Sequence, residues 1–126
     1  MKRFALDKLK KWKDNKSKKP LIIRGARQVG KTWLMKEFGR TCYENALYVN
    51  FDRNQMMQDL FDRDLDPVRL IKGLELAYNT KINPESTLLI FDEIQEVPNA
   101  LSSLKYFYEN APQYQIIAAG SLLGVA

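Results

Sequence analysis

Histidine is absent from the 126 residues, and cysteine occurs once, at Cys42. A single cysteine cannot close a disulfide within the chain, and without histidine no His/Cys cluster has the spacing of a zinc site. We therefore expect Cys42 to be a free thiol with no special chemistry. The sequence also lacks an apolar run of about 18 residues that could cross a bilayer, and residues 1–4 do not begin a secretory signal. The default expectation is a cytoplasmic protein without a membrane partner.

Most of the chain carries little net charge, although the total is +5. Residues 1–20 hold nine Lys/Arg and two Asp, which gives +7, whereas residues 21–126 hold eleven basic and thirteen acidic residues, which gives −2. A basic segment can contact nucleic acid or a membrane surface, but a solvated lysine-rich face is the commoner outcome. A nucleic-acid partner is therefore possible but not supported by charge.

The apolar pattern predicts an α/β fold. Residues 3–14 have helical spacing, and residues 1–19 are interpreted as a basic amphipathic helix with its linker, ahead of a core over residues 20–126. Short apolar runs at 21–23, 46–49, 87–91 and 115–119 are typical of buried parallel strands. Helical patterns lie between them: one ends at Gly39, one is capped by Asp66-Pro67, and one begins at Pro98 with Leu101, Leu104 and Tyr108 on one face. Strands alternating with helices predict a three-layer sandwich around a parallel sheet.

A phosphate-loop motif, G-x-x-x-x-G-K-[ST], follows the first predicted strand and precedes a helix. It consists of Gly25, Ala26, Arg27, Gln28, Val29, Gly30, Lys31 and Thr32. The glycines allow backbone N–H groups to approach phosphate oxygens, Lys31 adds a charge for the β- and γ-phosphates, and Thr32 offers a hydroxyl to Mg²⁺. The alternative is a tight glycine turn without a ligand. The strand on one side and the helix on the other meet the conditions for a phosphate loop.

Two carboxylates, Asp92 and Glu93, follow the apolar run at 87–91. Open α/β sheets bind ligands at the carboxyl ends of their strands. In this Walker B position we expect Asp92 to hold the Mg²⁺ shell and Glu93 to orient or deprotonate the attacking water. The alternative is an acidic turn that solubilises a strand end. No N-K-x-D guanine motif is found after an apolar strand, so ATP is favoured over GTP.

Other residues of the sequence are also candidates for a site. Ser121 follows the fourth predicted strand, where it could sense a γ-phosphate or simply form a turn. For Asn50, Asp52 and Arg53, after the second strand, a solvated loop is favoured over a site. Trp12 is expected in the core rather than against adenine, and the acidic cluster is expected to cap helices and face solvent rather than bind calcium. That cluster comprises Asp59, Asp62, Asp64 and Asp66.

The segments RGARQVGKT, YVNFD, LLIFDEIQ and IIAAGSLLG together resemble the prokaryotic AAA-like ATPases labelled AAA_14, which are found with a DUF4143 region. The resemblance implies an additional-strand P-loop ATPase core, ATP and Mg²⁺ as ligands, Glu93 as the water-activating residue and Ser121 near a sensor position. Such proteins continue beyond the position of Ala126 with a fifth strand and a helical lid, so the core is expected to be truncated after its fourth strand. No arginine follows Arg69 to serve as an arginine finger, so hydrolysis by this chain alone is expected to be weak or absent.

Three functions remain open. The first is an ATPase module whose full-length parent hydrolyses ATP and whose ligands are ATP and ADP. The second is a nucleotide-dependent module that binds a protein, a nucleic acid or a second copy of itself without hydrolysis. The third, a small-molecule kinase, would need an acceptor-binding lid that the sequence does not show.

Overall fold

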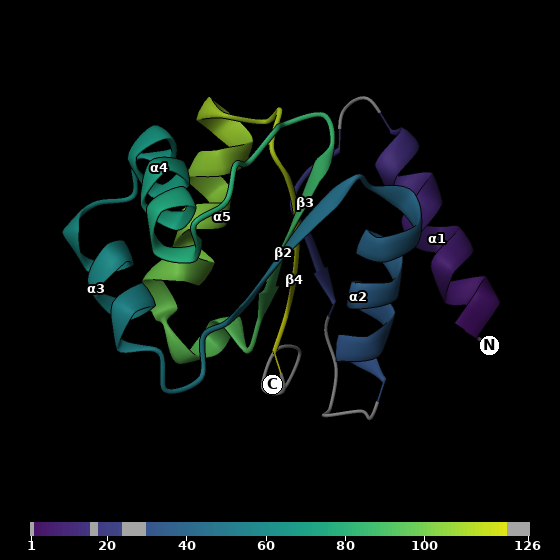
Figure 1. The fold of residues 1–126 in the computed structure, drawn as a ribbon, viewed down its shortest axis with the longest axis horizontal. Helices are drawn as coiled ribbons and strands as arrows, with labels where there is room; N and C mark the ends of the chain where they lie inside the picture. The colour runs from purple at the N-terminus through teal and green to yellow at the C-terminus, as the bar shows by residue number, and fades with distance from the viewer. Residues whose placement is uncertain (1, 16–17, 24–29, 121–126) are drawn as a thin grey trace.

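The computed structural model describes residues 2–15, 18–23 and 30–120, with side chains described from Ala5 onward. It is built from three layers, with helices on both faces of a central sheet (Figure 1). The helices are α1 (Lys2–Asp14), α2 (Lys31–Cys42), α3 (Gln55–Arg63), α4 (Pro67–Tyr78), α5 (Pro98–Asn110) and the short 3₁₀ helix η1 (Ile94–Glu96). The strands are β1 (Leu21–Ile23), β2 (Asn45–Asn50), β3 (Thr87–Asp92) and β4 (Gln115–Ala119).

The four strands form one sheet in the order β1-β4-β3-β2, and every pair is parallel. This confirms the predicted parallel sheet and its four strands, and it places β4 beside β1. In the register, Ile23 and Asp92 both pair with Ala119, and Asn50 pairs with Asp92. All four strands therefore end at the same edge of the sheet.

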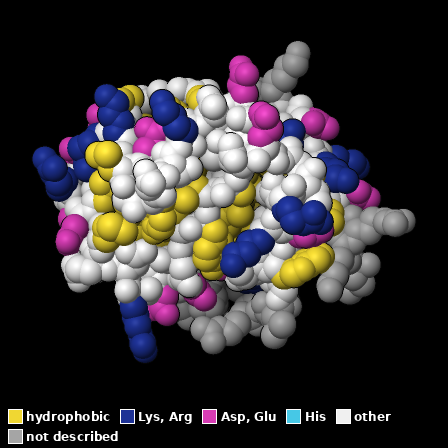
Figure 2. Space-filling model, in the orientation of Figure 1, with side chains coloured by type: hydrophobic (Ala, Val, Ile, Leu, Met, Phe, Trp, Pro, Cys, Tyr) yellow, Lys and Arg dark blue, Asp and Glu magenta, His cyan; other side chains and the backbone are white. Residues whose placement is uncertain are grey.

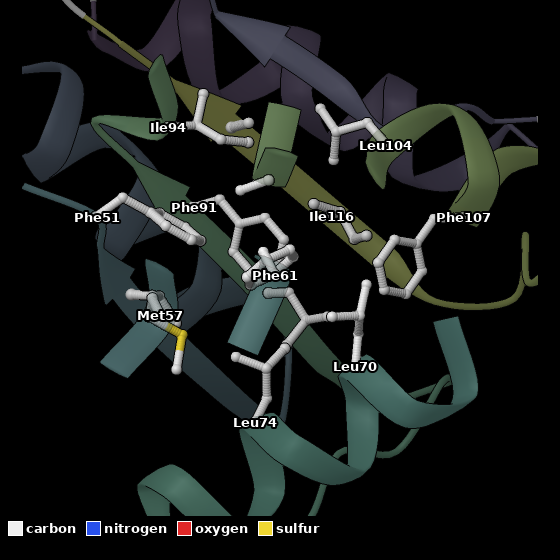
Figure 3. Close-up of a cluster of buried hydrophobic side chains, with 14 of the residues drawn as sticks. Phe51, Met57, Phe61, Leu70, Leu74, Phe91, Ile94, Leu104, Phe107 and Ile116 are labelled. Atoms are coloured by element: carbon white, nitrogen blue, oxygen red, sulfur yellow. The ribbon is translucent and has the colours of Figure 1, made fainter. Parts of the chain in front are cut away.

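Alternating side chains of the strands feed two cores. Leu88 and Ile90 of β3 point to the face covered by α1 and α2, whereas Leu89 and Phe91 point to the face covered by α3, α4 and α5. In the larger core, the rings of Phe51, Phe61 and Phe91 pack edge to face on one another, with centroids 5.3–6.4 Å apart (Figure 3). Every residue of β3 is buried, which explains why this strand reads as an unbroken apolar run.

The prediction that a helix ends at Gly39 is wrong. Helix α2 continues to Cys42, and Gly39 is one of its buried residues. A Cβ built on Gly39 would lie 2.7 Å from the Cβ of Ala46 on β2, so the helix can approach the sheet only because this residue has no side chain. The glycine signals a close approach between helix and strand, not a helix terminus.

We predict that Gly39→Ala lowers the free energy of unfolding by about 1–3 kcal/mol, the usual cost of an added methyl group in a packed core. Alanine has the better helix propensity by about 1 kcal/mol, but Ala46 Cβ belongs to the sheet and cannot rotate away. Urea unfolding measures the effect, and Ala46→Gly in the same background should restore part of the loss. A variant as stable as the wild type would show that the layers can move apart freely.

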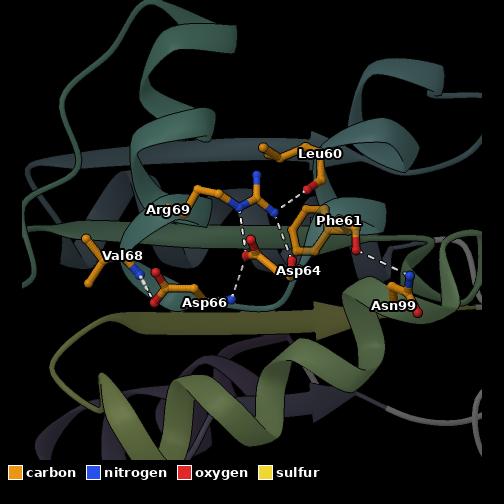
Figure 4. Close-up of polar contacts among 7 residues, drawn as sticks. All are labelled: Leu60, Phe61, Asp64, Asp66, Val68, Arg69 and Asn99. Atoms are coloured by element: carbon orange, nitrogen blue, oxygen red, sulfur yellow. Dashed lines mark hydrogen bonds and ion pairs between the residues drawn. The ribbon is translucent and has the colours of Figure 1, made fainter.

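The connection from α3 to α4 contains two residues of the acidic cluster, Asp64 and Asp66. The Oδ1 atom of Asp66 accepts a hydrogen bond from the N–H of Val68 at 3.3 Å, which confirms the predicted cap of α4. Arg69 donates from Nε to Asp64 Oδ1 at 2.7 Å and from Nη2 to the carbonyl oxygen of Leu60 at 2.6 Å (Figure 4). This hydrogen bonding lowers the pKa of the exposed Asp64 carboxyl. These contacts fix the turn between the two helices.

Two helices differ from the expectation. Helix α3 was not predicted, although Asn54 caps it by accepting from the N–H of Met57 at 3.1 Å. Helix α5 begins at Pro98 as predicted, but its buried face is Ala100, Ser103, Leu104 and Phe107. Tyr108, expected on the core face, is 41% exposed.

Candidate phosphate and metal site

Helix α2 begins at the edge of the sheet where the parallel strands end. Of the residues predicted for the site, the structure describes Gly30, Lys31 and Thr32 at the start of α2, and Asp92 and Glu93 at the end of β3. The remaining predicted phosphate contacts lie outside the described residues, namely Gly25, Ala26, Arg27, Gln28, Val29 and Ser121. The described part of the site is thus the helix terminus together with the acidic strand end.

Gly30 is the N-cap of α2 and has a φ of +113°. This backbone conformation is strained for any residue with a Cβ, even though a Cβ here would meet no atom within 4 Å. The carbonyl of Gly30 accepts from the N–H of Leu34 at 2.8 Å and so makes the first helical hydrogen bond. The positive end of the helix dipole lies at this terminus and suits an anion.

Thr32 and Asp92, which are 60 residues apart in sequence, are in direct contact. The Oγ1 atom of Thr32 donates a hydrogen bond to Oδ2 of Asp92 at 2.6 Å. Asp92 is buried, with 6% of its surface exposed. Its other oxygen, Oδ1, accepts the N–H of Glu93 at 3.0 Å. The two residues predicted to hold a metal ion are therefore brought together, each through an oxygen atom.

Glu93 adopts a left-handed backbone conformation, with φ 52° and ψ 42°, between β3 and η1. This conformation is uncommon for a residue with a side chain and is a form of strain often found at functional sites. Gln95 donates from Nε2 to Glu93 Oε1 at 2.9 Å and to Glu96 Oε2 at 3.3 Å. The Gln95 amide therefore orients the Glu93 carboxylate, while Gln95 Oε1 is buried without a hydrogen-bond partner in the described part of the chain.

Sequence reasoning missed Tyr48 as a site residue. Its hydroxyl donates to Asp92 Oδ2 at 2.8 Å, the same oxygen that Thr32 contacts. Burial and this hydrogen bond raise the pKa of Tyr48. A signal was available in principle, because the hydroxyl of a partly buried tyrosine usually has a hydrogen-bond partner. The pattern does not say which group that partner is.

Asn50 is the last residue of β2, and Asp52 and Arg53 form an exposed turn after the buried Phe51. Asn50 Oδ1 accepts the N–H of Asp52 at 2.9 Å, and Arg53 has a φ of +52°.

Trp12 packs edge to face on Phe38, with ring centroids 6.2 Å apart, and donates from Nε1 to the carbonyl of Lys19 at 2.7 Å. Trp12 thus packs in the core between α1 and α2, as expected.

The oxygen atoms of Thr32 and Asp92 fit a hard divalent cation. No group of three or more His, Cys, Asp or Glu side chains that would hold a metal occurs within residues 2–15, 18–23 and 30–120. A cation here would take its remaining ligands from phosphate oxygens and water. Mg²⁺ binds proteins in this manner, through one or two side-chain oxygens together with substrate phosphates.

Comparison with known protein families agrees with the α/β fold described above. The family model AAA_14, described as an AAA domain, matches residues 17–126. No curated protein matches the chain. Among the described helices, none has the length and apolar character needed to span a membrane.

Proposed function

This chain belongs to the AAA_14 family of AAA domains, a nucleotide-binding ATPase type of module, and we propose that it binds ATP with Mg²⁺ and hydrolyses it in the full-length gene product. The observation that carries the proposal is the 2.6 Å contact between Thr32 Oγ1 and Asp92 Oδ2. It joins the residue after the phosphate-loop lysine to the aspartate at the end of β3. A tight glycine turn and a solubilising acidic strand end would not require such a contact.

The phosphate loop, Lys31 and Ser121 would contact different parts of the ATP phosphates. The loop from Gly25 to Gly30 would wrap the phosphates with its backbone N–H groups, and Lys31 would neutralise the β- and γ-phosphates. Ser121 would sense the γ-phosphate. The last role is supported by the position of β4, which lies between β1 and β3 and ends at the same edge.

Thr32 and Asp92 would hold Mg²⁺, which when bound neutralises phosphate charge during transfer. Thr32 can present a lone pair to a cation and still donate its proton to Asp92, because a hydroxyl has both. Glu93 would accept a proton from the attacking water, and Gln95 limits the orientations of its carboxylate through the 2.9 Å hydrogen bond. The buried position of Asp92 keeps water from competing for its oxygens.

Asp92→Asn tests the metal role. We expect the variant to bind ATP without Mg²⁺ as the wild type does, and to lose about tenfold or more of the affinity that Mg²⁺ adds, because an amide oxygen attracts a cation less than a carboxylate does. Calorimetric titrations with ATP, in Mg²⁺ or in a chelator, measure both quantities.

Asp7→Asn makes the same change of charge on the exposed side of α1 and serves as the control. It should leave both titrations unchanged. If Asp92→Asn, folded as judged by thermal unfolding, keeps the full gain from Mg²⁺, Asp92 does not hold the metal.

A second candidate is a nucleotide-dependent interaction module that does not hydrolyse ATP. It is favoured by α1, which buries Leu9 against the core and leaves Lys10 and Lys11 exposed. On the face seen in Figure 2, basic and acidic side chains are interspersed, so this view adds no extended basic surface. ATP binding without turnover in the full-length gene product would favour this candidate.

A further inference from the structure

We propose that Tyr48 is a positioning residue that holds the Asp92 carboxylate for Mg²⁺, an inference that rests on the proposed function. The Tyr48 hydroxyl donates to Asp92 Oδ2 at 2.8 Å, and Thr32 donates to the same atom at 2.6 Å. The backbone N–H of Glu93 occupies Oδ1 at 3.0 Å. Three donors from β2, α2 and the start of the β3–η1 turn thus fix both oxygens.

The sheet register explains why Tyr48 reaches this carboxylate. Tyr48 pairs with Ile90 on β3, and Asp92 is two residues further along. Residues two apart on a strand share a face, so Tyr48 and Asp92 are diagonal neighbours on the side covered by α2. A hydroxyl on a strand is a more rigid support than one on a loop.

Helix α2 holds Tyr48 from the other side. The Nζ atom of Lys36 lies 4.1 Å from the centroid of the Tyr48 ring, which is the geometry of a cation–π contact. Lys36 is one helical turn after Thr32, so the two residues lie on the same side of α2. Helix α2 therefore contacts the Asp92 carboxylate directly through Thr32 and indirectly through Lys36 and Tyr48.

The hydroxyl of Tyr48 acts as a donor toward Asp92 in this arrangement. A tyrosine hydroxyl is protonated at neutral pH and can therefore donate this hydrogen bond. A protonated phenol orients a carboxylate by donating to it and brings no charge of its own to the site. Tyr48 thus acts through Asp92, as partners of metal ligands generally do.

Tyr48→Phe removes one oxygen atom and tests the proposal. We expect the affinity of ATP in the presence of Mg²⁺ to fall about tenfold, the lower end of the range for partners of metal ligands. Affinity in a chelator should stay within about twofold, because Tyr48 would act on the metal ligand and not on the phosphate loop. Calorimetry under both conditions separates the two.

Tyr43→Phe is the matched control. Tyr43 is a buried tyrosine in the same core, its pKa is also raised by burial, and its hydroxyl donates to Gln115 Oε1 at 2.6 Å. Gln115 is at the amino end of β4, at the opposite edge of the sheet from Asp92. This variant should lose stability but keep the gain in affinity from Mg²⁺. Equal losses with and without Mg²⁺ in Tyr48→Phe, or no loss at all, would overturn the proposal.

A second measurement needs no nucleotide. The ¹³C resonance of the Asp92 carboxyl group should shift in Tyr48→Phe and stay in place in Tyr43→Phe, because only the first variant removes a donor from Asp92. An unchanged resonance would refute the positioning contact even if ATP binds. A shifted resonance in a protein whose wild type binds no ATP would instead refute the proposed function and leave the contact established.

Discussion

We expect Lys31→Ala to lower the affinity of this protein for ATP by about 100-fold. The reason is that a hydrogen-bonded charge at a phosphate contributes about 1.5–3 kcal/mol. Lys31 is the first residue of α2, directly after the Gly30 cap. Its ammonium group would add a full charge to the partial charge of the helix terminus. The loss should appear with and without Mg²⁺, since Lys31 would contact the phosphates themselves.

The dependence of the affinity loss on Mg²⁺ distinguishes Lys31→Ala from the variants of the metal site. Asp92→Asn and Tyr48→Phe should reduce only the part of the affinity that depends on Mg²⁺. Lys72→Ala on α4 removes the same charge from an exposed position on the opposite face of the sheet and should bind ATP normally. If Lys31→Ala also binds ATP normally, the motif from Gly25 to Thr32 does not hold phosphate in this protein.

Much of the site could be predicted because its signals are local in sequence. The phosphate loop is one short segment, and Asp92 ends one buried strand. The contact between Thr32 and Asp92 needs only one further rule, that parallel strands end at a common edge. The register confirms this rule, since Ile23 and Asp92 both pair with Ala119.

The residues that sequence reasoning missed depend on contacts between elements. A strand pattern can indicate that Tyr48 faces the core. It does not indicate that the Tyr48 hydroxyl lies 2.8 Å from Oδ2 of Asp92 on the neighbouring strand β3. The amide of Gln95 donates to Glu93 at the turn that ends β3, where Glu93 has a positive φ. Gly39 was misinterpreted for the same reason: a glycine suits both a helix terminus and a close approach, and Ala46 on β2 decides which.

Glu93→Gln should lower ATP turnover by the full-length gene product by about 10²–10⁴-fold, the usual contribution of a general base. ATP binding should persist, because the side chain keeps its shape and would contact the attacking water rather than the phosphates. Steady-state phosphate release measures turnover, and calorimetry on the same sample measures binding. Binding that survives a loss of turnover is the result expected of a residue that acts on water.

Glu96→Gln is the control that isolates this role. Glu96 shares the Gln95 amide with Glu93, at 3.3 Å instead of 2.9 Å, but its side chain is exposed on η1. The variant removes a neighbouring carboxylate without removing the proposed base, so turnover should change by less than about tenfold, below the usual contribution of a base. If Glu93→Gln hydrolyses ATP at the wild-type rate, another group activates the water. If both variants lose turnover equally, the orientation of the Gln95 amide matters more than the basicity of Glu93.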